Sequence, residues 1–366
     1  MMKKVMFICL ALKSGGAERV INILANEFLN RGFDVTILAF RESSDCYGLD
    51  ERIHLELHSV ADLSWFSKRV ERIKLIRKVI REKEIDLAIA FSYYLNMSTV
   101  LANVGLKCKV IISERNDPAQ EDNKFLLKHI RNILYRFADL LVCQTEEAKA
   151  YFPSKVQEKA VVILNPLTNT LPEPFKGERE REIVCYARLN VQKNLPMLIN
   201  AFAMVYQKHS DYRLKIYGDG EEKEKLIQLV NELNLIGVAE ILPFSNDIHQ
   251  DVLKAGMFVL PSNYEGLSNS MLESLALGLP TICTDCPCGG ARMIIDDHWN
   301  GLLVPVGDTE KLASAINELI ENPTLAKIIS RNAVEVRKKL DSQKICDEWI
   351  NAIKKVCNLS KNLETN

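Results

Sequence analysis

The sequence of 366 residues lacks a long hydrophobic run and lacks an excess of charge of either sign. No run approaches the roughly 20 apolar residues that cross a bilayer, so a soluble or peripheral protein is expected. The chain has 47 Lys and Arg against 48 Asp and Glu. A dedicated nucleic-acid-binding protein normally carries a basic excess, so that class is not expected. Hydrophobic residues at 47% and charged residues at 26% exclude a disordered or fibrous chain.

Features of a metal site or a disulfide scaffold are also missing. The ten cysteines are scattered, which is typical of reduced core thiols. Cys283, Cys286 and Cys288 lie close to His298, but a structural zinc site normally has four ligands at regular spacings. The chain contains no Asp-x-Asp sequence that could hold a divalent ion against a diphosphate. We therefore expect no metal and no cofactor.

Short β-branched runs alternate with helical patterns along most of the chain. Strands are expected at 5–10, 35–40, 87–91, 110–113, 140–144 and 161–164, and again at 183–187, 214–218, 239–242, 257–260, 281–284 and 302–305. Helices are expected at 17–31, 195–209, 222–233 and 267–277, and helical structure throughout 309–359. Apolar strands separated by helices indicate parallel sheets covered on both faces. The fold class is therefore α/β, with two Rossmann-like doubly wound domains.

The two series of strands are separated by a segment with linker composition. Residues 166–181 contain Pro166, Pro172 and Pro174 and show no hydrophobic periodicity. The predicted domains are therefore 1–165 and 182–342. Ligands of such sheets bind at the carboxyl ends of strands, so a cleft between the domains is the expected active site.

Two cations follow the first strand of the second domain. Arg188 and Lys193 stand ahead of a helix, where fixed positive charge would stabilise a diphosphate leaving group without a metal. An ordinary solvated loop explains the pair equally well when it is considered alone.

Two carboxylates form the strongest motif. Glu265 lies in a glycine-containing loop after a strand, and Glu273 follows about two turns down the next helix. Each carboxylate could accept two hydrogen bonds from a vicinal diol of a sugar or ribose.

Glycines follow two further strands. Gly15 and Gly16 precede a helix, where the backbone could approach a phosphate or sugar closely. Gly218, in Gly218-Asp219-Gly220, stands in a similar place. Plain tight turns, with the aspartate as a helix cap, explain both segments as well.

These motifs occur together in one order, and Asn300-Gly301-Leu302-Leu303-Val304 follows them. In this combination the chain resembles a family 4 glycosyltransferase of the GT-B fold, a retaining enzyme that uses a nucleotide sugar. The resemblance implies that Arg188 and Lys193 bind the donor diphosphate and that Glu273 binds the ribose. It further implies that Glu265 holds the donor sugar and phosphate together with Gly266, Leu267, Ser268 and Asn269.

The resemblance extends to both ends of the chain. Gly15 and Gly16 would approach the donor from the first domain, and a final helix at about 343–366 would cross back to that domain. Many relatives place a histidine near the acceptor where this chain has Glu114-Arg115. Which of these two residues replaces the histidine stays open. Retaining members have no agreed protein nucleophile, so no catalytic base is assigned.

Two first-domain helices are rich in cations and apolar residues. The first spans residues 68–83, and the second carries Lys124, Lys128, Arg131 and Arg136. A solvated basic face explains them, and so does contact with an anionic membrane surface. Tyr93, Tyr94 and Asn96 are candidate acceptor contacts, although a surface turn explains them almost as well.

The sequence thus predicts a bacterial-type glycosyltransferase that moves a hexosyl or N-acetylhexosaminyl group from a UDP-sugar. Its similarity to galactosyl- and N-acetylgalactosaminyltransferases of surface-polysaccharide assembly implies a polyprenyl-diphosphate saccharide as acceptor. We expect a cytoplasmic enzyme, peripheral on the inner face of the cell membrane. Two alternatives stay open: a sugar-nucleotide 2-epimerase of the same fold, and a non-catalytic protein that binds a sugar nucleotide or a membrane surface.

Overall fold

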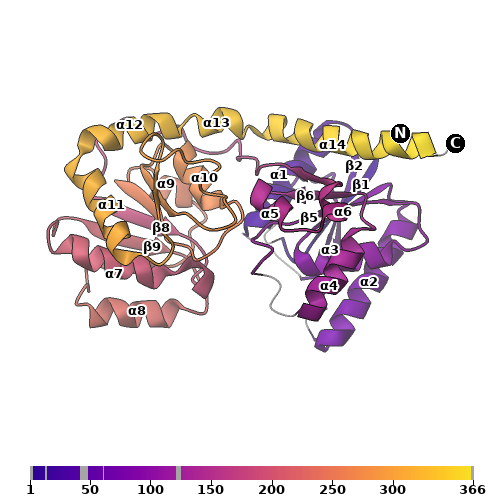
Figure 1. The fold of residues 1–366 in the computed structure, drawn as a ribbon, viewed down its shortest axis with the longest axis horizontal. Helices are drawn as coiled ribbons and strands as arrows, with labels where there is room; N and C mark the ends of the chain where they lie inside the picture. The colour runs from indigo at the N-terminus through magenta and orange to yellow at the C-terminus, as the bar shows by residue number, and fades with distance from the viewer. Residues whose placement is uncertain (1–2, 13–14, 42–47, 61, 121–124, 364–366) are drawn as a thin grey trace. The chain divides into compact units, whose positions relative to one another are not determined.

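The structure, a computed structural model, describes residues 3–12, 15–41, 48–60, 62–120 and 125–363. The chain forms two compact units (Figure 1). Unit 1 consists of Met1–Pro166 and Asp341–Asn366, and unit 2 of Leu167–Leu340. Residues 167–181, which have linker composition, are thus grouped with unit 2.

Unit 1 is built on a parallel sheet of seven strands in the order β3-β2-β1-β4-β5-β6-β7. The strands are β1 (Lys4–Cys9), β2 (Asp34–Ala39), β3 (His54–Leu57), β4 (Leu87–Phe91), β5 (Lys109–Ser113), β6 (Leu140–Cys143) and β7 (Ala160–Val162). All five residues of β4 are buried, as expected for a central strand with helices on both faces. The edge strand β3 was not predicted, because most of its side chains are exposed and its sequence has no apolar run.

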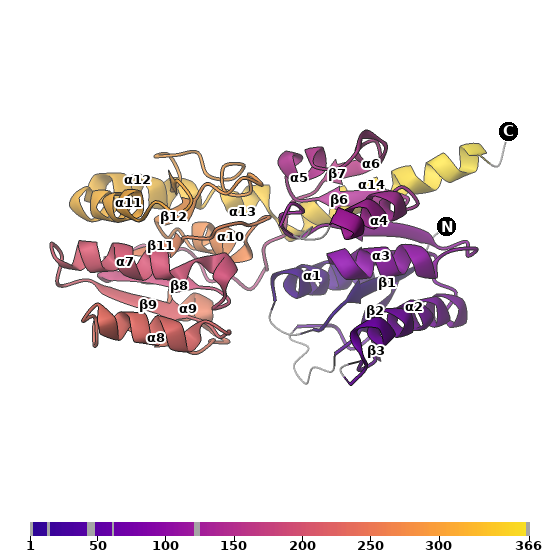
Figure 2. The same ribbon diagram turned by 60° about the horizontal axis from the view of Figure 1, so that its bottom comes forward.

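The helices of unit 1 are α1 (Gly16–Asn30), α2 (Trp65–Glu82), α3 (Tyr93–Ala102), α4 (Phe125–Tyr135), α5 (Glu146–Ala150), α6 (Ser154–Gln157) and α14 (Ser342–Leu363). Helices α2, α3 and α4 pack in succession across one face of the sheet (Figure 2). Helix α14 packs against α1, and its Trp349 ring stacks on Phe91 of β4 with ring centroids 5.8 Å apart. The chain end therefore contributes to the core of unit 1.

Unit 2 is built on a parallel sheet of six strands in the order β10-β9-β8-β11-β12-β13. The strands are β8 (Glu182–Tyr186), β9 (Arg213–Tyr217), β10 (Ala239–Leu242), β11 (Met257–Leu260), β12 (Thr281–Thr284) and β13 (Leu302–Val304). The helices are η1 (Val191–Lys193, a 3-10 turn), α7 (Leu195–Tyr206), α8 (Lys223–Glu232), α9 (Ile248–Asp251), α10 (Asn269–Ala276), α11 (Thr309–Glu321), α12 (Pro323–Ala333) and α13 (Val336–Lys339).

The prediction of two parallel α/β domains is confirmed by these two sheets. The prediction of one helical stretch over 309–359 was wrong in detail, because four helices, α11 to α14, occupy it. Asn322 ends α11 and also caps α12, whose first residue is Pro323. Among the described residues, no helix is long and apolar enough to cross a membrane.

Candidate active site

Two loops of unit 2 are held side by side at the carboxyl ends of the neighbouring strands β8 and β11. The backbone amide of Asn263 donates to the Gln192 carbonyl (2.8 Å), and the Gln192 side chain donates to the Tyr264 carbonyl (3.0 Å). The Asn190 side chain caps the 3-10 turn by accepting from the amide of Lys193 (3.3 Å). These bonds fix the backbone between Arg188 and Lys193 and the backbone just before Glu265.

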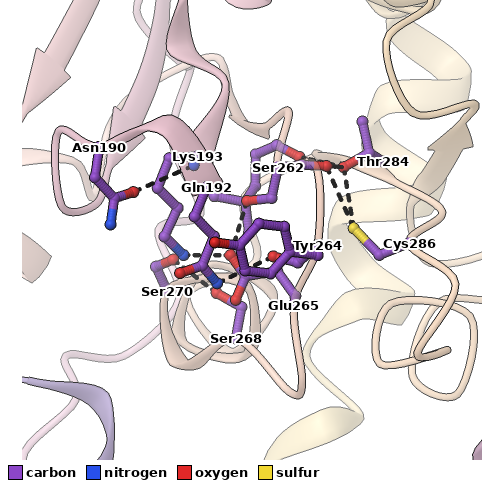
Figure 3. A network of polar contacts seen from close by, with 11 residues as sticks. Asn190, Gln192, Lys193, Ser262, Tyr264, Glu265, Ser268, Ser270, Thr284 and Cys286 are labelled. Carbon is purple, nitrogen blue, oxygen red and sulfur yellow. Dashed lines mark hydrogen bonds and ion pairs between the residues drawn. The ribbon is translucent and has the colours of Figure 1, made fainter. Parts of the chain in front are cut away.

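The Lys193 ammonium forms an ion pair with Oε1 of Glu265 (Figure 3). The same oxygen accepts a hydrogen bond from the Ser262 hydroxyl (2.8 Å). Only 12% of the Lys193 side chain and 14% of the Glu265 side chain are exposed. Within the described part of the chain, Oε2 of Glu265 makes no hydrogen bond, so the carboxylate keeps acceptor capacity for a ligand hydroxyl.

A small pocket of about 10 Å³, enough for a single water, lies beside Glu265. Gly266, Ser268, Thr284 and Cys286 are among its lining residues. The Cys286 thiol donates to the Ser262 carbonyl (3.3 Å), and its burial raises its pKa to about 11. Since the neutral thiol is a poor nucleophile, this cysteine lines the pocket without supplying reactive chemistry.

The Gly266 loop leads into helix α10, whose N-cap is Ser268. The Ser268 and Ser270 hydroxyls lie 3.0 Å apart, and Leu267 is buried. A side chain at Gly290 would meet the Gly266 carbonyl at 1.7 Å, so the loop after β12 packs directly on this turn. Asn269 begins the helix, where free amide groups favour negative charge.

Glu273 lies inside α10 and is only 3% exposed. Its Oε2 is 2.9 Å from Nε2 of His249 in α9. The sequence predicted the glutamate but gave no signal for this histidine, because a single histidine on a short helix fits no motif.

Arg188 is exposed at the start of the loop that follows β8 and that also carries Lys193. In the part of the chain that the structure describes, its guanidinium makes no hydrogen bond or ion pair. Gly218 has a packing reason of its own: its φ is +155°, and a Cβ there would meet the Ala187 carbonyl at 2.0 Å. The absence of a side chain at Gly218 therefore lets the backbone just before Arg188 pack directly on this turn.

In unit 1, Gly15 is the N-cap of α1 and Gly16 is its first residue. Neither glycine has a positive φ, and the Glu18 carboxylate lies where a Gly15 side chain would be. The structure does not describe Lys13 and Ser14, the two residues that precede Gly15.

Glu114 and Arg115, which stand where many relatives are expected to have a histidine, differ in their environments. Glu114 is 2% exposed and accepts hydrogen bonds from the Tyr135 hydroxyl and the Asn96 amide (3.3 Å), so it is an internal group. The Arg115 guanidinium lies over the Phe91 ring (5.3 Å) and donates to Asn165. Burial lowers the pKa of Arg115 to about 9.

Several expectations for unit 1 need correction. Tyr93 and Asn96 are buried, and Asn96 binds Ser113, Glu114 and Tyr135, so neither is placed as a surface contact for an acceptor. Tyr94 is 41% exposed beneath the Arg69 guanidinium.

The predicted basic face of the second helix also needs correction. Arg131 is fully buried among aromatic rings, with its guanidinium carbon 4.8 Å from the Phe152 ring centroid. The Lys128 ammonium lies 4.5 Å from the Tyr151 ring centroid, and Lys124 lies outside the described residues. Arg131 therefore does not belong to an exposed basic face of this helix.

The described residues contain no group of three or more His, Cys, Asp or Glu that could hold a metal ion. Cys283, Cys286 and Cys288 are buried, whereas the two ring nitrogens of His298 lie near Asp297 (3.0 Å) and Glu318 (3.3 Å).

Comparisons with known proteins show the family of both units. Residues 169–336 match the family model "Glycosyl transferases group 1", and residues 14–168 match "Glycosyltransferase Family 4". A Campylobacter jejuni protein named GalNAc-alpha-(1->4)-GalNAc-alpha-(1->3)-diNAcBac-PP-undecaprenol alpha-1,4-N-acetyl-D-galactosaminyltransferase is 28% identical, covering 98% of this chain and 100% of its own. An uncharacterized glycosyltransferase of Haemophilus influenzae is 25% identical over 95% of this chain and 99% of its own.

Solved structures share the fold. Anabaena HepE in complex with UDP and glucose aligns with a TM-score of 0.84 at 20% identity, over 96% of this chain and 99% of its own. A sucrose-phosphate synthase of Thermosynechococcus elongatus aligns with a TM-score of 0.85 at 16% identity, over 98% of this chain and 100% of its own.

Proposed function

Because the chain belongs to the family 4 glycosyltransferases and has their GT-B fold, we propose that it moves a hexosyl or N-acetylhexosaminyl group from a UDP-sugar to a polyprenyl-diphosphate saccharide. Transfer retains the anomeric configuration and needs no metal ion. The C. jejuni relative is named for an undecaprenol-linked acceptor, which supports this acceptor class.

The observation that carries the proposal is the Lys193–Glu265 ion pair, together with an exposed Arg188 that forms no ion pair with another described residue. Negative charge develops on the UDP leaving group as the bond to the sugar breaks. Lys193 and Arg188 supply positive charge at one strand end, where it stabilises the transition state more than the ground state. Glu265 accepts hydrogen bonds from the sugar hydroxyls, and Glu273 accepts them from the ribose.

Thermal unfolding with nucleotides tests the donor class. A ligand present at 100 times its Kd stabilises the folded state by about 2.7 kcal/mol. We expect UDP to raise the melting temperature, GDP and ADP to leave it unchanged, and chelator to have no effect. The UDP shift should be lost in Arg188→Gln and kept in the control Arg331→Gln, since Arg331 is exposed on α12. A chain that no nucleotide stabilises would contradict the proposed donor site.

Turnover distinguishes the enzyme classes. Transfer should depend strictly on a polyprenyl-diphosphate saccharide. Conversion of UDP-N-acetylglucosamine in its absence would indicate a 2-epimerase instead. UDP binding without any turnover over a panel of acceptors would indicate a binding protein.

The same proposal places the enzyme on an anionic membrane surface, at the inner face of the cell membrane, through helices α2 and α4. Helix α4 and the turn after it point an apolar row outward, with exposed fractions of 70% for Leu126, 40% for Ile130, 54% for Ile133 and 72% for Phe137. The inward face of α4 carries the buried Arg131 instead. An apolar outer face is what an interfacial helix presents to lipid.

Cations are exposed on a second helix of unit 1. Lys74, Lys78 and Arg81 are exposed on α2, and α2 and α4 both pack against α3. Each cation near an anionic lipid surface contributes about 1 kcal/mol. We propose that the apolar row and these three cations meet anionic lipid together.

Vesicle sedimentation tests the membrane surface. Binding to vesicles of phosphatidylglycerol and phosphatidylcholine should fall in Ile133→Ser and in a triple change of Lys74, Lys78 and Arg81 to Glu. The control Ile328→Ser removes an equally large side chain, 41% exposed, from unit 2 and should bind as the unmodified chain does. Equal binding by all variants would contradict the membrane role of this surface.

A further inference from the structure

We propose that His249 is a positioning residue, which holds the Glu273 carboxylate in the orientation that receives the ribose diol of the donor. This inference rests on the proposed function, because it gives Glu273 the ribose as its ligand. The contact that carries it is the 2.9 Å approach of His249 Nε2 to Glu273 Oε2.

The pair is shielded from water. The side chain of Glu273 is 4% exposed and that of His249 is 18% exposed. A hydrogen bond to a carboxylate is stronger than one between neutral groups, and it is strengthened further where water is excluded. The contact therefore restrains the rotation of the glutamate side chain, which lowers the entropy that ligand binding costs.

Both helices that carry the pair are anchored. Ile248, next to His249, is 4% exposed and fixes α9 to the core of unit 2. The Tyr186 hydroxyl at the end of β8 donates to the Ser270 carbonyl (2.9 Å) and lies 2.8 Å from the Ser274 hydroxyl. These bonds hold α10 on either side of Glu273.

Tyr186 also limits where the imidazole can lie. Its ring stands edge-on to the His249 ring, with centroids 6.4 Å apart and an interplanar angle of 82°. Tyr186 thus supports α10 and the imidazole at once. A carboxylate has about four acceptor positions, and His249 takes one of them.

Ligand titrations with matched variants test the inference. In His249→Gln the amide nitrogen stands where Nε2 of the imidazole stood, so this variant keeps the donor. In His249→Asn the amide nitrogen falls short, at the position of Nδ1. We expect His249→Asn to bind UDP about tenfold more weakly, as for a lost hydrogen bond to a charged group, and His249→Gln to bind close to the unmodified chain.

The second ligand is 2′,3′-dideoxy-UDP, which lacks the diol. All three proteins should bind it with the same reduced affinity, because the action of His249 is exerted through the ribose hydroxyls. A merely structural histidine would lower the affinity for UDP and for dideoxy-UDP by the same factor, and that result would overturn the inference. An unchanged UDP affinity in His249→Asn would overturn it too.

Two further controls complete the test. If His249→Asn is unstable, His249→Leu, which keeps apolar packing against Tyr186 but has no donor, replaces it in the same comparison. If the unmodified chain binds UDP and dideoxy-UDP equally, Glu273 does not read the ribose and the inference fails. If it binds no UDP at all, the proposed function itself fails.

Discussion

Replacing Lys193 by methionine tests whether the buried ion pair of unit 2 is retained for stability or for catalysis. The change leaves the Glu265 carboxylate in a site where 14% of the side chain is exposed, with the Ser262 hydroxyl as the one remaining hydrogen-bond donor among the residues that the structure describes. Breaking a fully buried pair costs about 3–5 kcal/mol. Because Ser262 remains, and because the neighbouring pocket admits a water, we expect a loss of about 2 kcal/mol.

A double-mutant cycle separates the two roles. Glu265→Gln removes the unpaired charge, so the combined variant Lys193→Met/Glu265→Gln should regain about half of the lost stability. Transfer activity should not return with it, because the ammonium that stabilises the leaving group is still missing. Stability is measured by urea unfolding followed by circular dichroism, and activity by release of UDP.

Lys223→Met is the matched control for this cycle. Lys223 pairs with Asp219 at 3.2 Å on the surface of unit 2, where 34% and 61% of the two side chains are exposed. Such exposed pairs contribute about 0–1 kcal/mol. A loss of stability in Lys193→Met no larger than in this control would refute the reasoning, and so would strictly additive effects in the cycle.

Three further changes probe other parts of the chain. Gly290→Ala should lower the melting temperature and abolish the UDP shift in thermal unfolding, because its Cβ would lie 1.7 Å from the Gly266 carbonyl; an unaltered shift would contradict this packing. Tyr135→Phe removes a donor to the buried Glu114 and should reduce the free energy of unfolding in urea by about 1–3 kcal/mol. Iodoacetamide at pH 8 should label Cys286 only after unfolding, as followed by peptide mass spectrometry, because burial raises its pKa from 9.0 to about 11. For the same reason the unfolded chain loses this proton first, so stability should fall as the pH rises above about 9.

Much of the fold could be predicted because buried parallel strands appear in the sequence as short continuous apolar runs. The predicted strand at 87–91 coincides with β4, whose five residues are all buried. The edge strand β3 left no such trace, since a strand with one neighbour keeps most of its side chains in water. The break at Asn322-Pro323 carries ordinary capping residues, but the apolar periodicity on either side of it masked the boundary.

The sequence predicted which candidate site residues follow which strand, but not which strand ends lie side by side. Spacing showed that Lys193 follows one strand and Glu265 another. Their contact depends on β8 and β11 being neighbours, although β9 and β10 lie between them in sequence. Strand order is a property of the whole sheet, so no local pattern reveals which strand ends meet.

Helix α4 shows why a hydrophobic row can mislead. Leu126, Ile130 and Ile133 recur at helical spacing, which normally indicates the face that packs on the core. In the structure this row faces outward, and the opposite face of the helix supplies Tyr135, whose hydroxyl donates to the buried carboxylate of Glu114 just after β5. A buried carboxylate needs hydrogen-bond donors, so Tyr135 has a reason to face inward that the apolar pattern does not show. That exposed apolar row is the surface proposed to meet the lipid that carries the acceptor.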